Sequence, residues 1–211
     1  MGLHDKIILT AAEQIGYKEG RNNDTKFGKW YGMNNQPWCM MFVSWCADKA
    51  GVPKDIIPKL AYVPYCVDFY KKQNRYYKRG TYVPQPGDII FYGSSSHVGL
   101  VEKVSGNKVI TIEGNTSAGG NSSNGDGVYR RTRNLNDSWI MGYGSPDYKE
   151  DEMPEIKPVS VKNLDSNTYV EVKAVNIGGS NYINMRDLEK LFPVIIDWDG
   201  KSPTMKLNYK K

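Results

Sequence analysis

Hydrophobic positions in the N-terminal third of the chain repeat with helical spacing. Apolar residues in 3–16, LHDKIILTAAEQIG, recur every three or four positions, and Gly16 suits the C-terminus of a helix. Residues 36–51, QPWCMMFVSWCADKAG, are apolar almost all the way round, which is typical of a buried helix. A shorter helix is expected near residues 65–73, YCVDFYKKQ. The pattern thus predicts three helices, with Cys39 in the first turn of the second.

The hydrophobic pattern then changes to alternation with a period of two, which indicates β-strands separated by turns. Five such segments follow one another: 87–93 (GDIIFYG), 96–104 (SHVGLVEKV), 107–115 (NKVITIEGN), 127–133 (GVYRRTR) and 138–144 (SWIMGYG). Helices followed by strands predict an α+β domain over residues 1–146.

The composition changes after residue 146. Residues 147–158 hold five acidic side chains against two lysines, together with two prolines, so we expect an extended linker there. Residues 159–211 predict a small C-terminal α+β domain. Its expected elements are strands at 169–177, 181–184, 194–200 and 204–210, and a helix at 185–192 that begins after Asn184.

Charge suggests the class of partner. The 211-residue chain has a net charge of +5, and residues 1–145 hold 18 basic against 12 acidic side chains. This excess favours an anionic polymer, either nucleic acid or a polymer of the bacterial wall, although a merely soluble basic protein would show it too.

The apolar segments are short. No run approaches the roughly 18 apolar residues of a membrane helix, and no N-terminal segment fits a signal peptide. We therefore expect a protein made in the cytoplasm, without membrane insertion. Three cysteines give no even disulfide framework, so free thiols are expected, and a disulfide between Cys46 and Cys66 stays open.

Cys39 stands out because it begins an apolar helix. Free backbone N–H groups and the helix dipole favour a thiolate at this position, although most free cysteines are small buried hydrophobes. A nucleophilic cysteine needs a base, and the chain has two histidines. His4 lies among charged residues of the first helix and is expected to face solvent, whereas His97 opens a strand.

The hairpin that begins at His97 gathers polar residues. If residues 105–107 form a three-residue loop, Val104 pairs with Lys108. His97, Glu113 and Asn115 then share one face, with Asn115 opposite His97 and Glu113 on the diagonal. The other face holds Val98, Leu100, Ile110 and Ile112. A two-residue turn would separate the polar groups.

Cys39, His97 and Glu113 together supply a nucleophile, a base and an orienting group. The alternative is an ordinary hydrogen-bonded histidine at the polar end of a strand. That interpretation would hold if any of the three groups lay apart from the other two.

Three blocks of sequence, in order, resemble a known family: PWCMMFVSWCADKAG, PGDIIFYGSSSHVGLVEKV and ITIEGN. They are similar to the CHAP family of cysteine, histidine-dependent amidohydrolases and peptidases. The resemblance implies a papain-like fold for the N-terminal domain, cleavage of bacterial peptidoglycan and no cofactor. It also implies Cys39 as nucleophile, His97 as general base, Glu113 as the group that holds the histidine tautomer, and Asn115 as a further polar member of the site.

The sequence departs from the family near the cysteine. Some members carry an aspartate-rich calcium loop there, whereas WYGMNNQPWC has no acidic residue, so no metal is expected. Some relatives have glutamine beside the cysteine, where this chain has Trp38. Gln36 and the Cys39 backbone N–H remain as candidate oxyanion donors.

Aromatic residues near the motifs are candidates for a substrate groove, with core packing as the alternative. They are Trp30, Tyr31, Trp38 and Tyr92.

The tail from residue 159 resembles a small repeat domain, named after the N-terminal part of copper amine oxidase, that is common in cell-wall proteins of anaerobic Firmicutes. It contains no His or Cys, so copper is not expected. Wall attachment or self-association is the role that this resemblance implies.

The sequence therefore favours a peptidoglycan hydrolase, a phage or prophage endolysin made in the host cytoplasm and acting on the wall after release. We expect cleavage of an amide bond, with N-acetylmuramoyl-L-alanine amidase preferred over a stem or cross-bridge endopeptidase. Glycosidic cleavage fits least, because it needs a pair of carboxylates. A non-catalytic wall-binding protein and an acyltransferase are the alternatives of other classes. Nucleic acid is not expected as a partner.

Overall fold

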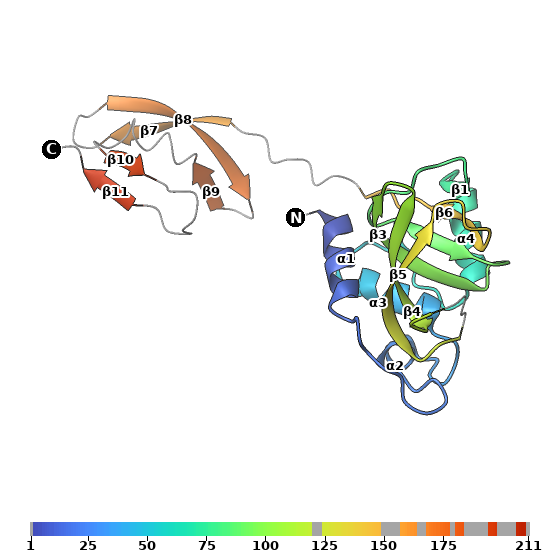
Figure 1. The fold of residues 1–211 in the computed structure, drawn as a ribbon. Helices are drawn as coiled ribbons and strands as arrows, with labels where there is room; N and C mark the ends of the chain where they lie inside the picture. Colours follow the sequence, from blue (N-terminus) through green and yellow to red (C-terminus); the bar gives the residue numbers. More distant parts are fainter. Residues whose placement is uncertain are drawn as a thin grey trace. The chain divides into compact units, whose positions relative to one another are not determined.

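The computed structural model describes residues 2–119 and 124–148, together with the backbone of five strands between residues 157 and 209. It divides into two units, Met1–Lys149 and Glu150–Lys211 (Figure 1). In the described part of the chain, no helix is both long and apolar enough to cross a membrane.

The first unit contains the three helices that the hydrophobic pattern predicts, and a further short one. They are α1 (Leu3–Ala12), α2 (Lys26–Tyr31), α3 (Cys39–Lys49) and α4 (Val63–Lys72). Helix α1 ends before Gly16, which lies in the following turn with a φ of 92°. Helix α2 was not expected in its polar segment. It is capped by Thr25, whose side chain accepts a hydrogen bond from the Gly28 N–H at 2.9 Å.

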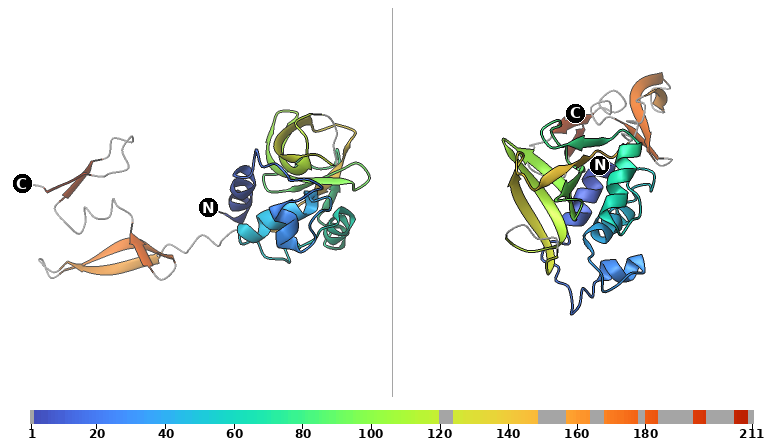
Figure 2. Two further views of the ribbon diagram at one scale, coloured as in Figure 1. Left: turned by 90° about the horizontal axis from the view of Figure 1, so that it is seen from below. Right: turned by 90° about the vertical axis from the view of Figure 1, so that its right-hand side faces the viewer.

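Six antiparallel strands follow: β1 (Tyr76–Lys78), β2 (Ile89–Tyr92), β3 (His97–Ser105), β4 (Lys108–Thr116), β5 (Gly127–Asn134) and β6 (Ile140–Gly144). They form one sheet in the order β1-β6-β2-β3-β4-β5. In Figure 2 the helices, in blue and teal, lie together beside the sheet, in green and yellow. The predicted α+β class and five of the strands are confirmed. The sequence pattern missed β1, which has only three residues.

A hydrophobic cluster lies on each face of the sheet. The larger cluster joins α1, α3 and α4 to Phe91, Val98, Leu100 and Ile112. The smaller cluster contains Ile90, Tyr92, Val101, Val109, Ile140 and Tyr143. Because side chains alternate along a strand, His97 on β3 and Glu113 on β4 belong to the face of the smaller cluster.

The β3–β4 hairpin corrects the predicted turn. Ser105 pairs with Lys108, so the loop has two residues rather than three, and Gly106 has the positive φ of 56° that such a turn requires. The register then shifts by one residue between Val101 and Lys103. Beyond this bulge Leu100 pairs with Ile112, as predicted. The two-residue turn therefore does not separate the polar groups, because the bulge restores the register.

Five strands are described in the second unit. Strands β7 (Lys157–Asn163), β8 (Thr168–Ile177) and β9 (Ser180–Ile183) form one antiparallel sheet, and β10 (Val194–Asp197) pairs with β11 (Lys206–Tyr209). The four strands predicted in the tail are confirmed. Strand β7 was missed, and it includes the last two residues of the predicted linker 147–158. The predicted helix 185–192 lies outside the described residues.

Candidate active site

Helix α3 presents Cys39 at its N-terminus. Trp38 is the N-cap and Cys39 is the first helical residue, with 4% of its surface exposed. Strand β4 packs directly on this turn, since a Cβ added at Gly114 would lie 2.6 Å from Phe42 and 2.7 Å from Trp38. The first turn of α3, whose N–H groups lack helical partners, is therefore held against Gly114 of β4.

A cavity of about 500 Å³ opens onto Cys39. Its walls come from the loop before α3, the first turn of α3, the start of α4 with the segment before it, and the β2–β3 loop. The lining residues are Met33, Gln36, Pro37, Cys39, Met41, Ala61, Tyr62, Val63, Pro64, Ser94, Ser95 and Ser96. His97 directly follows Ser96, so the nucleophile and the histidine lie at the same end of the sheet.

Cys39 differs from the other two cysteines. All three thiols are free, but Cys46 and Cys66 are fully buried in the core between the helices and the sheet. Burial raises the pKa of both of these thiols well above the usual range. Of the three thiols, Cys39 is the one that lines the cavity.

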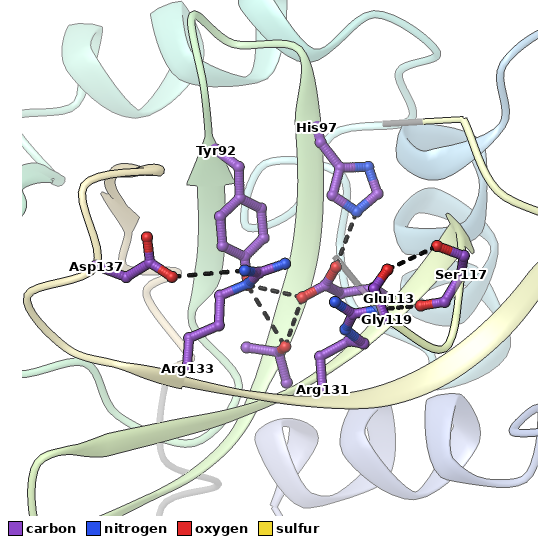
Figure 3. A network of polar contacts seen from close by, with 9 residues as sticks. Tyr92, His97, Glu113, Ser117, Gly119, Arg131, Arg133 and Asp137 are labelled. Carbon is purple, nitrogen blue, oxygen red and sulfur yellow. Dashed lines mark hydrogen bonds and ion pairs between the residues drawn. The ribbon is translucent and has the colours of Figure 1, made fainter. Parts of the chain in front are cut away.

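His97 and Glu113 form a fully buried pair. The Nε2 atom of His97 lies 2.9 Å from Oε2 of Glu113. The hydroxyls of Tyr92 and Thr111 each donate a hydrogen bond of 2.7 Å to Oε1 of Glu113 (Figure 3). Burial raises the pKa of the Glu113 carboxyl, but its contacts with His97, Thr111 and Tyr92 outweigh burial and hold the pKa below its usual value. Glu113 is therefore an anion.

The pKa of His97 is raised from 6.5 to about 9. Burial alone would lower the pKa, but hydrogen bonding and charge attraction from Cys39 and Glu113 outweigh it. Glu113 occupies Nε2, which leaves Nδ1 as the ring nitrogen that interacts with Cys39. The ring carries a positive charge at neutral pH.

Aromatic stacking fixes the plane of the His97 ring. The Trp139 ring lies 5.8 Å from His97 at an interplanar angle of 14°, and the Tyr92 ring lies 5.7 Å away at 25°. The Arg133 guanidinium covers Trp139 at 4.4 Å and Tyr92 at 5.1 Å, as Figure 3 shows for Tyr92. These rings hold the imidazole plane without hydrogen-bonding to it.

Gly99 makes room for the carboxylate. A Cβ at this position would lie 2.6 Å from Cγ of Glu113. A glycine inside a strand weakens it, and here the missing side chain allows Glu113 to lie across β3 toward His97.

Asn115 lies in an irregular stretch of β4. It is fully buried with a φ of 56°, in the left-handed region, and the β4–β5 register shifts between Glu113 and Thr116. Its carbonyl accepts a hydrogen bond of 3.0 Å from the Gly125 N–H. The β3–β4 pairing ends at Leu100 and Ile112, so the position of Asn115 opposite His97 stays a prediction.

Two of the predicted groove aromatics belong to the interior instead. Trp38 is fully buried, stacks on Phe27 at 5.1 Å and donates its indole N–H to Glu19 at 2.6 Å. Tyr92 is also fully buried, and its hydroxyl is bonded to Glu113. Neither ring reaches the cavity, so the prediction that they line it is wrong.

Trp30 and Tyr31 are half-buried, and they also do not line the Cys39 cavity. Trp30 lines a different pocket of about 270 Å³, where the Lys59 ammonium lies 4.4 Å from its ring. Tyr31 packs against the larger hydrophobic cluster. Gln36, in contrast, is exposed and lines the cavity beside Cys39, as an oxyanion donor must.

Sequence reasoning missed several residues of the site. The alternation along β4 could have indicated Thr111, because a residue two positions before Glu113 lies on the same face of the strand. Tyr92 was predicted to line the groove. It pairs with His97 across strands β2 and β3, and from there its hydroxyl donates a hydrogen bond to Glu113. Trp139 lies more than 40 residues from His97 in sequence, and no local pattern indicates their contact.

The described residues contain no group of three or more His, Cys, Asp or Glu side chains that could hold a metal ion.

Comparison with known families agrees with this geometry. Residues 30–115 match the CHAP domain family. The match begins in α2, contains Cys39, His97 and Glu113, and ends at Asn115. The CHAP match thus covers the helix tip and the hairpin that form the site.

No curated protein matches the sequence. Among solved structures, the chain is similar to the crystal structure of Ly7917 and to that of Ly7917 with the hydrolyzing product of MDP. Both show 14% sequence identity and a TM-score of 0.42 over 85% of this chain, and the alignments cover 91% and 81% of the two Ly7917 chains.

Proposed function

We propose that the unit Met1–Lys149 is a peptidoglycan hydrolase that cleaves an amide bond with Cys39 as the nucleophile. The observation that carries this proposal is the cavity that opens onto Cys39 beside the buried, protonated His97. The CHAP match over residues 30–115 supports it, because that family cleaves peptidoglycan.

The reaction follows from the charges of the site. The proton of the Cys39 thiol rests on Nδ1 of His97, which gives a thiolate beside an imidazolium, and the thiolate attacks the carbonyl carbon of the amide. The imidazolium then gives its proton to the departing amine, which leaves an acyl-cysteine thioester. Neutral His97 next takes a proton from water, whose oxygen attacks the thioester, and the carboxylic acid is released while the Cys39 thiolate and the imidazolium are restored.

The other groups hold this geometry. Glu113 accepts a hydrogen bond from the Nε2–H and so keeps Nδ1 directed at the sulfur. The Cys39 backbone N–H and the Gln36 side chain lie at the cavity and supply donors for the oxyanion. Asn115, buried after Glu113, is proposed as a further polar member of the site.

The preferred substrate bond is the lactyl to L-alanine amide of N-acetylmuramoyl peptides. This bond is common to peptidoglycans whose cross-bridges differ, so one enzyme can cut walls of several species. The stem or cross-bridge peptide bond is the alternative, because the same thiol chemistry cleaves both. A glycosidic bond offers no acyl group to a thiolate.

Mass spectrometry of peptidoglycan digested by the full chain tests the proposal. The expected products are stem peptides with a free L-alanine N-terminus and intact glycan strands. A new N-terminus within the stem or the bridge would instead assign an endopeptidase. New reducing ends on the glycan, or no soluble product, would contradict amide hydrolysis.

A further inference from the structure

Exposed apolar side chains concentrate at the rim of the Cys39 cavity. Six large hydrophobic residues are exposed in the described part of the chain, and three of them, Met33, Tyr62 and Tyr65, gather here. Tyr62 is 57% exposed and lines the cavity, and Tyr65 is 63% exposed. Their rings meet edge to face with centroids 5.0 Å apart. Exposed apolar groups clustered at a concave site indicate a binding surface.

Helix α4 holds this pair in place. Tyr62 is the N-cap of α4, and Pro64 fixes the first turn. Val63, Cys66 and Val67 bury the other side of the helix in the core. The rings are therefore presented by a rigid element and not by a mobile loop, which lowers the entropy that is lost when a ligand binds.

Apart from Cys39, which is charged when it is a thiolate, no residue that lines the cavity has a charged side chain. None of its other residues is Asp, Glu, Lys, Arg or His. Its polar groups are neutral, namely the amide of Gln36 and the hydroxyls of Tyr62 and three consecutive serines, Ser94–Ser96. A charged group placed in such a cavity would lose hydration without gaining an ionic partner.

The stem peptides and the glycan strands of peptidoglycan differ in charge. Stem peptides carry carboxylates and ammonium groups. The sugar rings carry hydroxyl and acetamido groups, and they are neutral once the lactyl carboxyl is joined to the stem. A pyranose ring also has an apolar face of C–H groups, which suits an aromatic ring, and hydroxyls at its edge, which suit serine and amide side chains.

We propose that the cavity, with Tyr62 and Tyr65 at its rim, is a glycan subsite that holds the N-acetylmuramoyl sugar next to the scissile amide. This inference rests on the proposed function and adds which part of the substrate the cavity binds. The sugar on Tyr62 places its lactyl carbonyl at Cys39, and the charged stem extends outward from the cavity.

The test measures protection of the Cys39 thiol in the full chain. Iodoacetamide should alkylate Cys39 and not Cys46 or Cys66, which are fully buried, and the modified peptide identifies the site. Peptide-free glycan strands whose lactyl carboxyls are capped as methyl amides, and are therefore neutral, should slow this alkylation about fivefold at about four times their Kd. Free stem peptides at the same concentration should not slow it.

Variants of Tyr62 separate ring stacking from general apolar contact. Tyr62→Phe keeps the aromatic face and should keep the protection by glycan strands. Tyr62→Leu keeps an apolar side chain without that face and should lose the protection, as should Tyr65→Leu in part. Both side chains are more than half exposed, so the fold should persist, which circular dichroism checks. Undiminished protection in Tyr62→Leu, or protection by stem peptides alone, would overturn the proposal.

This readout does not depend on hydrolysis. If the glycan subsite is wrong, alkylation is insensitive to glycan strands while the wild-type protein still releases amide-cleavage products. If the proposed function is wrong, those products are absent whatever the alkylation experiment shows. The two failures are therefore distinguishable.

Discussion

The ionisation of His97 and that of Glu113 depend on each other. Glu113 is an anion because three side chains bind its two oxygens, and its charge helps to keep the pKa of His97 at about 9. Because this pKa lies above the ordinary 6.5, the stability that protonated His97 adds to the fold is fully present below pH 6.5 and is lost as the pH rises through about 9. For Glu113, whose pKa is lowered, the contribution is fully present above pH 4.5 and is lost as the pH falls through the lowered pKa.

We therefore expect kcat/KM to fall as the pH rises through about 9, where His97 loses its proton. Glu113→Gln removes a negative charge that raises this pKa, so the alkaline limb should move to lower pH, with a reduced rate at neutral pH. Glu102→Gln is the matched control, since Glu102 lies on β3 but binds Arg130 at the surface. Identical alkaline limbs in the wild type and Glu113→Gln would contradict this coupling.

At the scale of elements, the site depends on how α3, β3 and β4 meet. The bulge in β3 restores the register that brings Glu113 to His97, and the glycines at 99 and 114 allow close approach. Gly99 leaves room for the carboxylate, and Gly114 allows β4 to contact the first turn of α3. The nucleophile and the acid–base pair are thus joined by backbone packing and not by a flexible loop.

Gly114→Ala tests this packing. The added methyl would lie 2.6 Å from Phe42, so we expect a loss of about 1–3 kcal/mol in the free energy of unfolding. We also expect kcat to fall in the fraction of protein that stays folded, because Cys39 moves away from His97. Gly119→Ala is the control, since no atom lies within 4 Å of the added methyl. Chemical denaturation and hydrolysis rates measure both effects. Wild-type stability and activity in Gly114→Ala would show that the contact does not position the helix.

The periodic parts of this arrangement were predictable from sequence. The three longer helices, five strands and the contact of His97 with Glu113 follow from apolar spacing, because a period of two assigns each side chain to a face. The turn length was predicted wrongly, since a compensating bulge leaves no periodic signal. The groove aromatics were wrong for another reason. Packing between distant segments decides which rings are buried, so Trp38 is interior while Tyr62 is exposed.

At the scale of the whole molecule, the chain has two units, and the proposed chemistry belongs to the first. Met1–Lys149 contains Cys39, His97 and Glu113, together with both hydrophobic clusters that support them. The excess of basic over acidic side chains also lies in this part of the sequence. We propose attachment to the wall as the role of Glu150–Lys211, in keeping with its resemblance to a repeat domain of wall proteins.

A chain that ends at Lys149 should therefore hydrolyse purified, soluble peptidoglycan as fast as the full chain, because the whole site is retained. It should bind intact Gram-positive cells more weakly, and sedimentation with cells measures this. The isolated segment 150–211 serves as a competitor and should displace the full chain. Equal cell binding by the full and shortened chains would leave the second unit without a role in attachment.

Clearing of Gram-positive cell walls by Cys39→Ala tests the central claim most directly. We expect the rate to fall at least about a thousandfold with the fold intact, since the attacking sulfur is lost. Cys66→Ala is the matched control and should keep its activity with some loss of stability, because Cys66 is fully buried in the core and does not line the cavity. Substantial clearing by a folded Cys39→Ala protein would contradict a cysteine nucleophile.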